Sequence, residues 1–401
     1  MEFRGGPTGF WEIFRGSKTN GIILQKLNDL IDAGVIIHRR TYQTVFHSYK
    51  EHLQKLLMQS TDMPLQVCRQ IIQNDLSNFK KDHSSSKAPM NRIPKNGKMI
   101  QFLFKVFINR LRFHYNRLFK QEHWDIGISN NLKNKIPNTS DFTNTKWLKL
   151  RKGAKYAADS FCFESNNTQF VIFEDYDYKH KRGSISLAKL QENLEPINIK
   201  TALEKPYHLA YPYIFQHHKE IFLIPETAEN GSIELYKWRE ETEEFIFEQE
   251  LLNVAGVDSS LVYYKEKWWL FCGLKDDLPN EKLHIYYADQ LLGPYQAHSL
   301  NPVKVDPNGS RPAGQFIIEN NVLYRPAQKS VKWYGESINW FEVEELNENA
   351  FCEKKIAEIA PHKKWTHKDG VHTFAKTSQI MVIDAKRRKS GWHAMWSALG
   401  L

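Results

Sequence analysis

The feature that most constrains the fold is a stretch that recurs five times between residues 156 and 386. In its clearest copy, residues 257–273, two aromatic and β-branched runs flank three polar residues, which predicts two β-strands joined by a tight turn. The polar residues that open the five copies are spaced 49, 50, 53 and 61 positions apart: Asp159, His208, Asp258, Arg311 and His372. A period of about fifty residues with several strands per repeat predicts a mainly β chain built as a five-bladed β-propeller.

In a propeller the first strand of each blade lines the central axis, so the five opening residues are expected to ring one mouth of the channel. Packing alone would select Val or Ile at such positions, which makes the polar side chains candidate site residues. We predict catalytic roles for Asp159 and Asp258 and ligand contacts for His208, Arg311 and His372. The alternative is that some of them only hold blades together through hydrogen bonds to backbone. Two histidines without a carboxylate between them do not predict a metal site.

Length and charge divide the chain into regions. A chain of 401 residues exceeds a single ordinary domain. Residues 1–150 hold 24 Lys/Arg against 11 Asp/Glu, whereas residues 151–401 hold 31 against 35, which indicates regions with different partners. The predicted regions are an N-terminal segment (1–80), a linker with a basic amphipathic helix (81–121), the propeller (122–388) and a basic tail (389–401).

Cysteine usage and hydropathy bear on the compartment. The four cysteines are widely spaced and form no CxxC pair, so neither a disulfide framework nor a zinc site is expected. No signal peptide is recognisable at the start, and no apolar run is long enough to span a bilayer. These features predict a cytoplasmic protein.

The N-terminal segment resembles part of a known family. Residues 7–15 are predicted as a helix, and residues 21–27 and 35–42 as strands. The loops Phe3-Arg-Gly-Gly-Pro-Thr-Gly-Phe-Trp-Glu12 and Leu27-Asn-Asp-Leu-Ile-Asp-Ala-Gly34 resemble the second half of a formyltransferase catalytic domain. The resemblance implies that Asp32 orients proton transfer while an amine attacks the formyl carbon.

The Asn and His that complete that chemistry in the family, and its folate-binding half, would precede residue 3. We therefore expect a truncated α/β formyltransferase-like segment, inactive by itself, and a 10-formyltetrahydrofolate cofactor only if the missing half exists. Either the gene start was assigned too late, or a remnant is kept as a scaffold. The first explanation is favoured, because two strands alone would expose an unpaired edge.

The middle of the chain contains predicted helices and a connector. Residues 46–80 are predicted as helices broken at Pro64, residues 82–97 as a linker, and residues 98–120 as a basic amphipathic helix. That helix either adsorbs to an anionic membrane surface, peripheral to its inner face, or packs its apolar stripe on the propeller. The helical spacing of its apolar residues favours packing on the propeller. No motif indicates specific nucleic-acid binding. A strand at 124–128 is expected to close the ring against the last blade.

The propeller resembles a second family through motifs spread over residues 122–388. These motifs are His208-Leu-Ala-Tyr-Pro-Tyr, Ile224-Pro-Glu-Thr-Ala-Glu, Trp268-Trp-Leu-Phe, Gly293-Pro-Tyr, Arg311-Pro-Ala-Gly, Arg325-Pro-Ala-Gln and Tyr334-Gly. They resemble the N-terminal domain of plant glucosamine inositolphosphorylceramide transferases, and similar bacterial domains exist. The resemblance implies a role in the biosynthesis of cell-surface polysaccharides or glycoconjugates, with a sugar nucleotide or glycan as partner. In the plant proteins a separate C-terminal domain carries the transfer chemistry.

The ring also resembles five-bladed glycosidases of the arabinanase and invertase kind. That resemblance implies axial carboxylates, which Asp159 and Asp258 match, and a Glu acid in the fourth blade, where Arg311 stands instead. Arg311 and Arg325 suit a phosphorylated or acidic sugar, and Glu226 is a further ligand candidate. We therefore expect a carbohydrate-active transferase or glycan-recognition protein. The alternatives are a glycoside hydrolase with a relocated acid and a non-catalytic scaffold.

Overall fold

The computed structural model describes residues 4–29, 34–72, 90–130, 134–148, 155–177 and 180–390. The chain divides into two compact units. One extends to Lys120, and the other comprises Gln121–Lys389 without the short segment Val305–Pro307. Each unit has its own hydrophobic core and is described separately.

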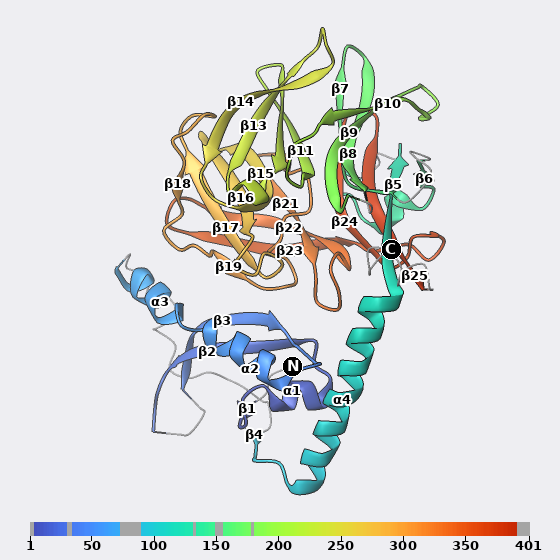
Figure 1. The fold of residues 1–401 in the computed structure, drawn as a ribbon. Coiled ribbons are helices and arrows are strands. Elements are labelled where there is room, and N and C mark those ends of the chain that lie inside the picture. The colour runs from blue at the N-terminus through green and yellow to red at the C-terminus, as the bar shows by residue number, and fades with distance from the viewer. Residues whose placement is uncertain are drawn as a thin grey trace. The chain divides into compact units, whose positions relative to one another are not determined.

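The C-terminal unit is a five-bladed propeller, as predicted (Figure 1). The first two blades are β7 (Lys155–Ser165), β8 (Thr168–Asp177), β9 (Arg182–Leu190) and β10 (Pro196–Leu203), then β11 (Ala210–His217), β12 (Glu220–Glu226), β13 (Ile233–Arg239) and β14 (Glu244–Leu252). The third is β15 (Gly256–Tyr264), β16 (Lys267–Leu274), β17 (Lys282–Ala288) and β18 (Gln296–Ala297), with β19 (Lys304–Val305) also paired to β17. The fourth is β20 (Ile317–Glu319), β21 (Val322–Lys329), β22 (Ser337–Leu346) and β23 (Phe351–Ile359).

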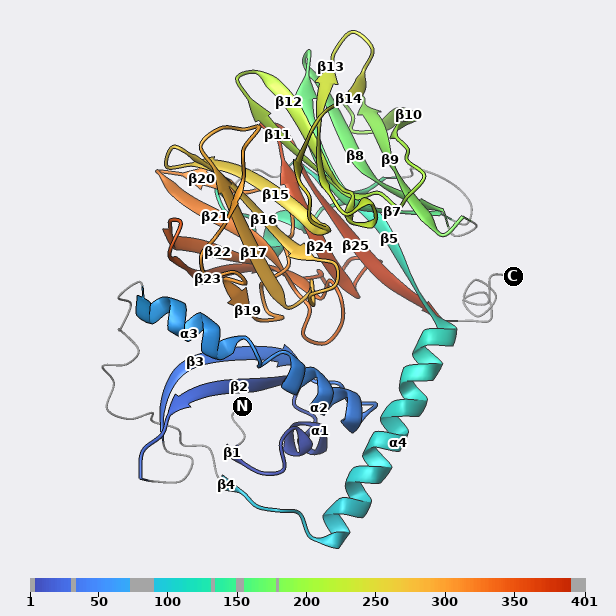
Figure 2. The same cartoon turned by 60° about the vertical axis from the view of Figure 1, so that its left-hand side comes forward.

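The fifth blade closes the ring with strands from both ends of the unit. Its order is β24 (Gly370–Lys376), β25 (Met381–Ser390), β5 (Lys120–Ser129) and β6 (Lys146–Trp147). The prediction that an early strand pairs with the last blade is therefore confirmed, and Figure 2 shows β5 alongside β25. Two short 3₁₀ helices, η2 (Thr139–Phe142) and η3 (Ala228–Asn230), complete the unit.

The first strands of the blades lie next to one another around the axis. The innermost strand β7 contacts both β11 and β24, and β11 contacts β15. These strands are largely buried on both faces because each lies between two neighbouring blades; in β15 only Tyr263 is exposed. Aromatic rings fill the space between blades 1 and 2, where Phe163 lies 5.2 Å from Trp238. This packing fixes the polar residues at the heads of the first strands.

The N-terminal unit combines an antiparallel β-hairpin with helices. Its elements are β1 (Arg4–Gly5), α1 (Phe10–Arg15), β2 (Thr19–Lys26), β3 (Val35–Gln43), α2 (Tyr49–Met58), α3 (Met63–Ile72), β4 (Met90–Asn91) and α4 (Asn96–Phe119). Strands β2 and β3 pair with each other, and β1 pairs with β4. The predicted helix break lies before Pro64, which stands in the first turn of α3, where its missing N–H costs nothing. Asp32 lies outside the described residues.

Helix α4 packs within the N-terminal unit. Phe102 is buried, and its ring stacks on Phe10 at 4.3 Å, with Phe14 and Val106 part of the same cluster. The expectation that the apolar stripe of this helix packs on the propeller is therefore wrong for Phe102 and Val106. The core that they join consists of α1 and neighbouring side chains.

Candidate functional site

A β-bulge at the head of the first strand sets the direction of the axial side chains. The pairing register shifts between Ala158 and Phe161 in blade 1, and at the corresponding place in blades 2, 3 and 5. Within the bulges Asp159, Tyr211 and Asp258 have φ of 51°, 41° and 52°. A bulge re-aims the side chain that would otherwise follow the strand alternation. Blade 2 therefore places Tyr211, and not His208, at the position equivalent to Asp159 and Asp258.

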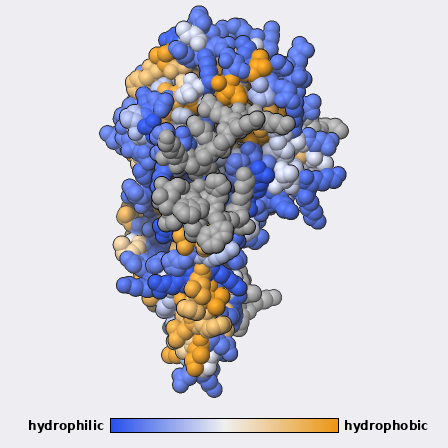
Figure 3. Space-filling view, turned by 45° about the vertical axis from the view of Figure 1, so that its right-hand side comes forward, coloured by the Kyte–Doolittle hydropathy of each residue, from blue (hydrophilic) through white to orange (hydrophobic). Residues whose placement is uncertain are grey.

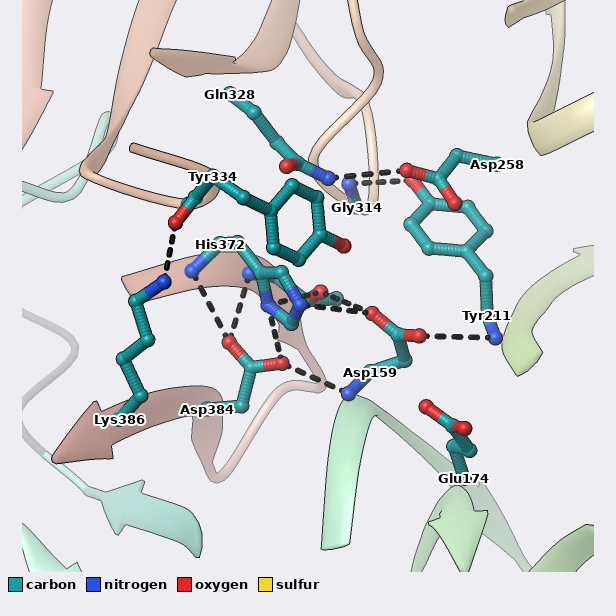
Figure 4. Close-up of polar contacts among 12 residues, drawn as sticks. Asp159, Glu174, Tyr211, Asp258, Gly314, Gln328, Tyr334, His372, Asp384 and Lys386 are labelled. Atoms are coloured by element: carbon teal, nitrogen blue, oxygen red, sulfur yellow. Dashed lines mark hydrogen bonds and ion pairs between the residues drawn. The ribbon is translucent and has the colours of Figure 1, made fainter. Parts of the chain in front are cut away.

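Asp159, His372 and Asp384 form a buried cluster next to these bulges (Figure 4). The Asp384 carboxylate accepts hydrogen bonds from the backbone N–H groups of Asp159 (2.7 Å), His372 (3.1 Å) and Thr373 (3.0 Å). His372 directs Nδ1 to Asp384 at 2.6 Å and Nε2 to Asp159 at 3.5 Å. Burial alone lowers the pKa of His372, but the charges of Asp384 and Asp159 outweigh it, so the net pKa is raised. The raised pKa favours the imidazolium form of His372, which pairs with both carboxylates.

Asp258 forms a second centre together with Arg311. The guanidinium donates to the Asp258 carboxylate through Nε (2.6 Å) and Nη2 (3.1 Å), and to Asn280 through Nη1 (3.0 Å). Gln328 donates a further hydrogen bond to Asp258 at 3.0 Å, and Tyr334 lies beneath the guanidinium at 4.9 Å. Arg311 is thus committed to a bidentate ion pair inside the protein. Its position does not support the expectation that it grips an anionic sugar.

Two glutamates from second strands join the aspartates. Glu226 ends β12 and accepts from the Asp258 backbone N–H at 3.2 Å, and its side chain stays half-buried. Burial, followed by the charge of Asp258, raises the pKa of Glu226 to about 8. Burial, followed by the charge of Asp159, raises the pKa of Glu174 on β8 well above its usual range. Protonated carboxyl groups therefore lie on the axis, although the fourth blade supplies none.

Asp159 links the two centres. Its carboxylate accepts hydrogen bonds from the Tyr211 N–H (3.3 Å) and from Thr373 Oγ1 (3.1 Å). Burial raises the pKa of Asp159 to about 6, against the opposing charge of His372. Cluster members therefore titrate near neutral pH, which is common at functional sites.

The other predicted ligand residues have different positions. His208 precedes β11; its Nδ1 accepts from the Gly183 N–H at 2.9 Å, and its Nε2 lies 3.7 Å from Glu174. Burial lowers the pKa of His208, so its ring is neutral. Arg325 is only 1% exposed, and its guanidinium donates to Glu353 and to the carbonyl groups of Gly309 and Ser310. The prediction that Arg325 contacts a ligand is not supported by this buried structural ion pair.

Asp159, His372 and Asp384 also offer ligand atoms within 4.8 Å of one another, a spacing that a metal ion requires. Both ring nitrogens of His372 face carboxylates, however, and its raised pKa favours the protonated form. A metal must displace that proton, so the donor set fits an ion-paired histidine better than a metal centre.

The sequence interpretation missed four members of the cluster: Tyr211, Glu174, Gln328 and Asp384. A signal for two of them is present, because the apolar runs of the second strands lead directly to Glu174 and Asp384, as they do to the predicted Glu226. Tyr211 carries no comparable signal, since an aromatic residue in an aromatic strand predicts only packing.

The family model described as "Glucosamine inositolphosphorylceramide transferase 1, N-terminal" matches residues 118–391. The chain belongs to this family. Proteins named Glucosamine inositolphosphorylceramide transferase 1 are 29% identical over 256 residues in Oryza sativa subsp. japonica and 27% over 258 residues in Arabidopsis thaliana. Both alignments cover 59% of this chain and 34% or 33% of the relative, so the chain spans about a third of the relatives' length. The resemblance of the propeller is confirmed, whereas that of residues 1–80 to a formyltransferase stays a prediction.

Two solved structures that align with this chain share similarity of fold alone. Zg3597, a family 117 glycoside hydrolase from Zobellia galactanivorans, aligns with a TM-score of 0.42 and 12% identity over 67% of this chain and 91% of its own. An inulosucrase from Halalkalicoccus jeotgali aligns with a TM-score of 0.39 and 9% identity over 59% and 82%.

Proposed function

We propose that the propeller is a sugar-binding domain with a glycosyltransferase-related role in glycoconjugate biosynthesis, and that the axial carboxyl cluster holds the sugar. Family membership supports the biosynthetic role. The observation that carries the site is the gathering of Asp159, Glu174, Glu226 and Asp258 at one mouth, with two of the pKa values raised to about 6 and about 8. Such a cluster costs stability, and carboxyl groups are the side chains that most often bind sugar hydroxyl groups.

The charge of the cluster bears on the kind of sugar. Asp384 is a fifth carboxyl group in this cluster. The cations of the cluster are His372 and Arg311, and both are already paired to carboxylates. An acidic or phosphorylated sugar would meet this negative field, and the expectation of an anionic sugar stays a prediction. A neutral sugar or an amino sugar fits better, because the ammonium group of an amino sugar would take the place of the proton that Glu226 carries. The name of these relatives includes glucosamine, which agrees with an amino sugar.

Glu226, Tyr334 and His208 are the half-buried members of the cluster and the groups that a sugar at this mouth would touch. Protonated Glu226 can donate a hydrogen bond to a hydroxyl group, or accept one from an ammonium once ionised. The more deeply buried Asp159 and Asp258 then set the field and hold the geometry.

A second candidate function, cleavage or transfer at a glycosidic bond, is favoured by one observation. The pKa of Glu226 is raised to about 8, whereas the pKa of the nearby Asp159 is raised only to about 6. One protonated and one ionised carboxyl group are what acid-assisted glycoside chemistry needs: the acid protonates the leaving oxygen while the C–O bond breaks, and water or an acceptor hydroxyl forms the new bond.

Titration calorimetry with glucosamine, glucose and glucuronic acid tests the proposal. The expected order of affinity is glucosamine first, glucose second and glucuronic acid last, because charge complementarity discriminates among sugars of similar shape. Tightest binding of glucuronic acid, or no binding of any sugar, would reject it. The same protein incubated with oligosaccharides containing glucosamine should leave them intact, and release of free sugar at ordinary enzyme rates would favour the second candidate instead.

A further inference from the structure

Helix α4 has two apolar faces, of which the N-terminal unit covers one. Phe102 and Val106 pack against Phe10, Phe14 and Tyr49. On the opposite side, at helical spacing of three or four residues, lies a continuous stripe whose members are 39–69% exposed: Ile100, Leu103, Phe104, Phe107, Leu111, Tyr115 and Leu118. Figure 3 shows hydrophobic side chains gathered in this part of the molecule. A stripe of this length in water is unfavourable unless something covers it.

Positive charge accompanies the stripe. Residues 96–119 contain five basic residues and no Asp or Glu: Lys98, Lys105, Arg110, Arg112 and Arg117. Lys105 donates to the Phe14 carbonyl, and Lys98 lies over the Trp11 ring. Arg110, Arg112 and Arg117 are exposed and have no carboxylate partner in the described part of the chain. The surface that covers the stripe must therefore combine an apolar interior with negative charge at its boundary.

We infer that α4 is a membrane-surface helix, which lies in the plane of a bilayer rich in anionic lipid with its exposed stripe in the acyl region. A stripe of Phe, Leu and Ile flanked by Arg and Lys is the pattern of helices that bind at the interface. Anionic headgroups supply the negative charge, and long basic side chains reach them from the edges of the stripe. No described helix is long and apolar enough to cross a bilayer, which agrees with a position in the plane.

A second copy of the chain is a poorer occupant. An isologous pair of α4 helices would bring two sets of the same five cations together without one carboxylate between them. Like charges that face each other across a protein interface cost several kcal/mol. The excess of charge extends beyond the helix, since residues 1–120 hold 20 Lys/Arg against 8 Asp/Glu. That excess also attracts the unit to an anionic surface from a distance.

Co-sedimentation of the full chain with vesicles of phosphatidylcholine, alone or mixed equally with phosphatidylglycerol, tests the inference. The chain should pellet with the mixed vesicles, bind weakly to pure phosphatidylcholine, and dissociate as salt is raised. Phe104→Glu/Phe107→Glu should weaken binding about a hundredfold or more, because two apolar anchors are lost and two repelled charges are gained. Arg110→Gln/Arg117→Gln should weaken binding about thirtyfold, at about fivefold for each cation.

Phe247→Glu is the matched control, since Phe247 is 52% exposed on β14 of the propeller and Phe107 is 56% exposed. It should bind vesicles as the wild type does. Phe104→Glu/Phe107→Glu should keep the wild-type melting temperature, because both side chains are exposed in the free protein. Absence of wild-type binding to mixed vesicles would overturn the inference. So would a dimer in light scattering that Phe104→Glu/Phe107→Glu dissociates, or a fall in melting temperature that shows another segment of this chain on the stripe.

Discussion

Asp384 organises the axial cluster at the scale of single residues. Its carboxylate accepts the backbone N–H groups at both bulges that it touches, and it also pairs with His372. The His372 ring stacks on Trp124 at 3.8 Å, which fixes its plane. We propose that His372 and Asp384 hold the geometry of the sugar site, while Glu226 contacts the sugar. Because its backbone partners lie 225 and 12 positions away, only the fold could reveal this role of Asp384.

The raised pKa of Glu226 predicts how stability depends on pH. The folded chain keeps this proton to about pH 8, whereas an unfolded chain releases it near the ordinary value of 4.5. Between these values the folded state binds more protons, so the free energy of unfolding falls as pH rises. His372 contributes in the same direction, because stability from its raised pKa is lost as pH rises through the folded value. We therefore expect Glu226→Gln, which has no proton to lose, to exceed the wild type by about 1–3 kcal/mol above pH 8.

Urea unfolding at about pH 6 and about pH 9 measures this difference, since the advantage of Glu226→Gln should be small at the lower pH and large at the higher. The control is Glu248→Gln, because Glu248 is exposed on β14 and should follow the wild type at both. Parallel pH dependence of Glu226→Gln and wild type would show that Glu226 ionises normally.

At the scale of elements, aromatic and β-branched runs separated by short polar turns predicted the strands, and their period of about fifty residues predicted the five blades. The sequence also predicted that the strand at 124–128 closes the ring, because no neighbouring strand in the sequence is available to pair with it. The bulges could not be predicted in the same way. An extra residue shifts which side chain faces the axis, so the alignment of polar residues by sequence chose His208 where the structure places Tyr211.

Gly314 joins blade 4 to β24 and provides a test of the element packing. It has φ of 117° and forms a bridge with Phe374, and a Cβ there would lie 1.9 Å from the Phe374 carbonyl oxygen. Gly314→Ala should destabilise the propeller by about 3 kcal/mol or more, because both strain and steric overlap oppose it.

Gly231→Ala is the matched control for the steric part of this effect. Gly231 also has a positive φ, of 76°, but nothing lies within 4 Å of its Cβ position. It should lose only about 1 kcal/mol, which is the cost of the backbone conformation. Denaturant unfolding of the two variants compares them, and equal losses would mean that the close approach at Gly314 is relaxed in solution.

At the scale of the whole molecule, charge differs between the two parts of the chain for which we propose different partners. The N-terminal residues are strongly basic and present the α4 stripe, whereas the propeller gathers carboxyl groups on its axis. Composition alone predicted that the two regions have different partners. Arg311 and Arg325 resemble anion-binding residues in the sequence, and only the structure shows their ion pairs with Asp258 and Glu353.

The most direct test of the axial sugar site is calorimetric titration of glucosamine into wild type, Glu226→Gln and Glu248→Gln at neutral pH. An ammonium group would displace the proton of Glu226 and form a charge-assisted contact that an amide cannot match. Glu226→Gln should therefore bind glucosamine about tenfold or more weakly than wild type, while Glu248→Gln binds it equally well. Wild-type affinity in Glu226→Gln, with its fold intact, would contradict the assignment of the sugar site to the axial carboxyl cluster.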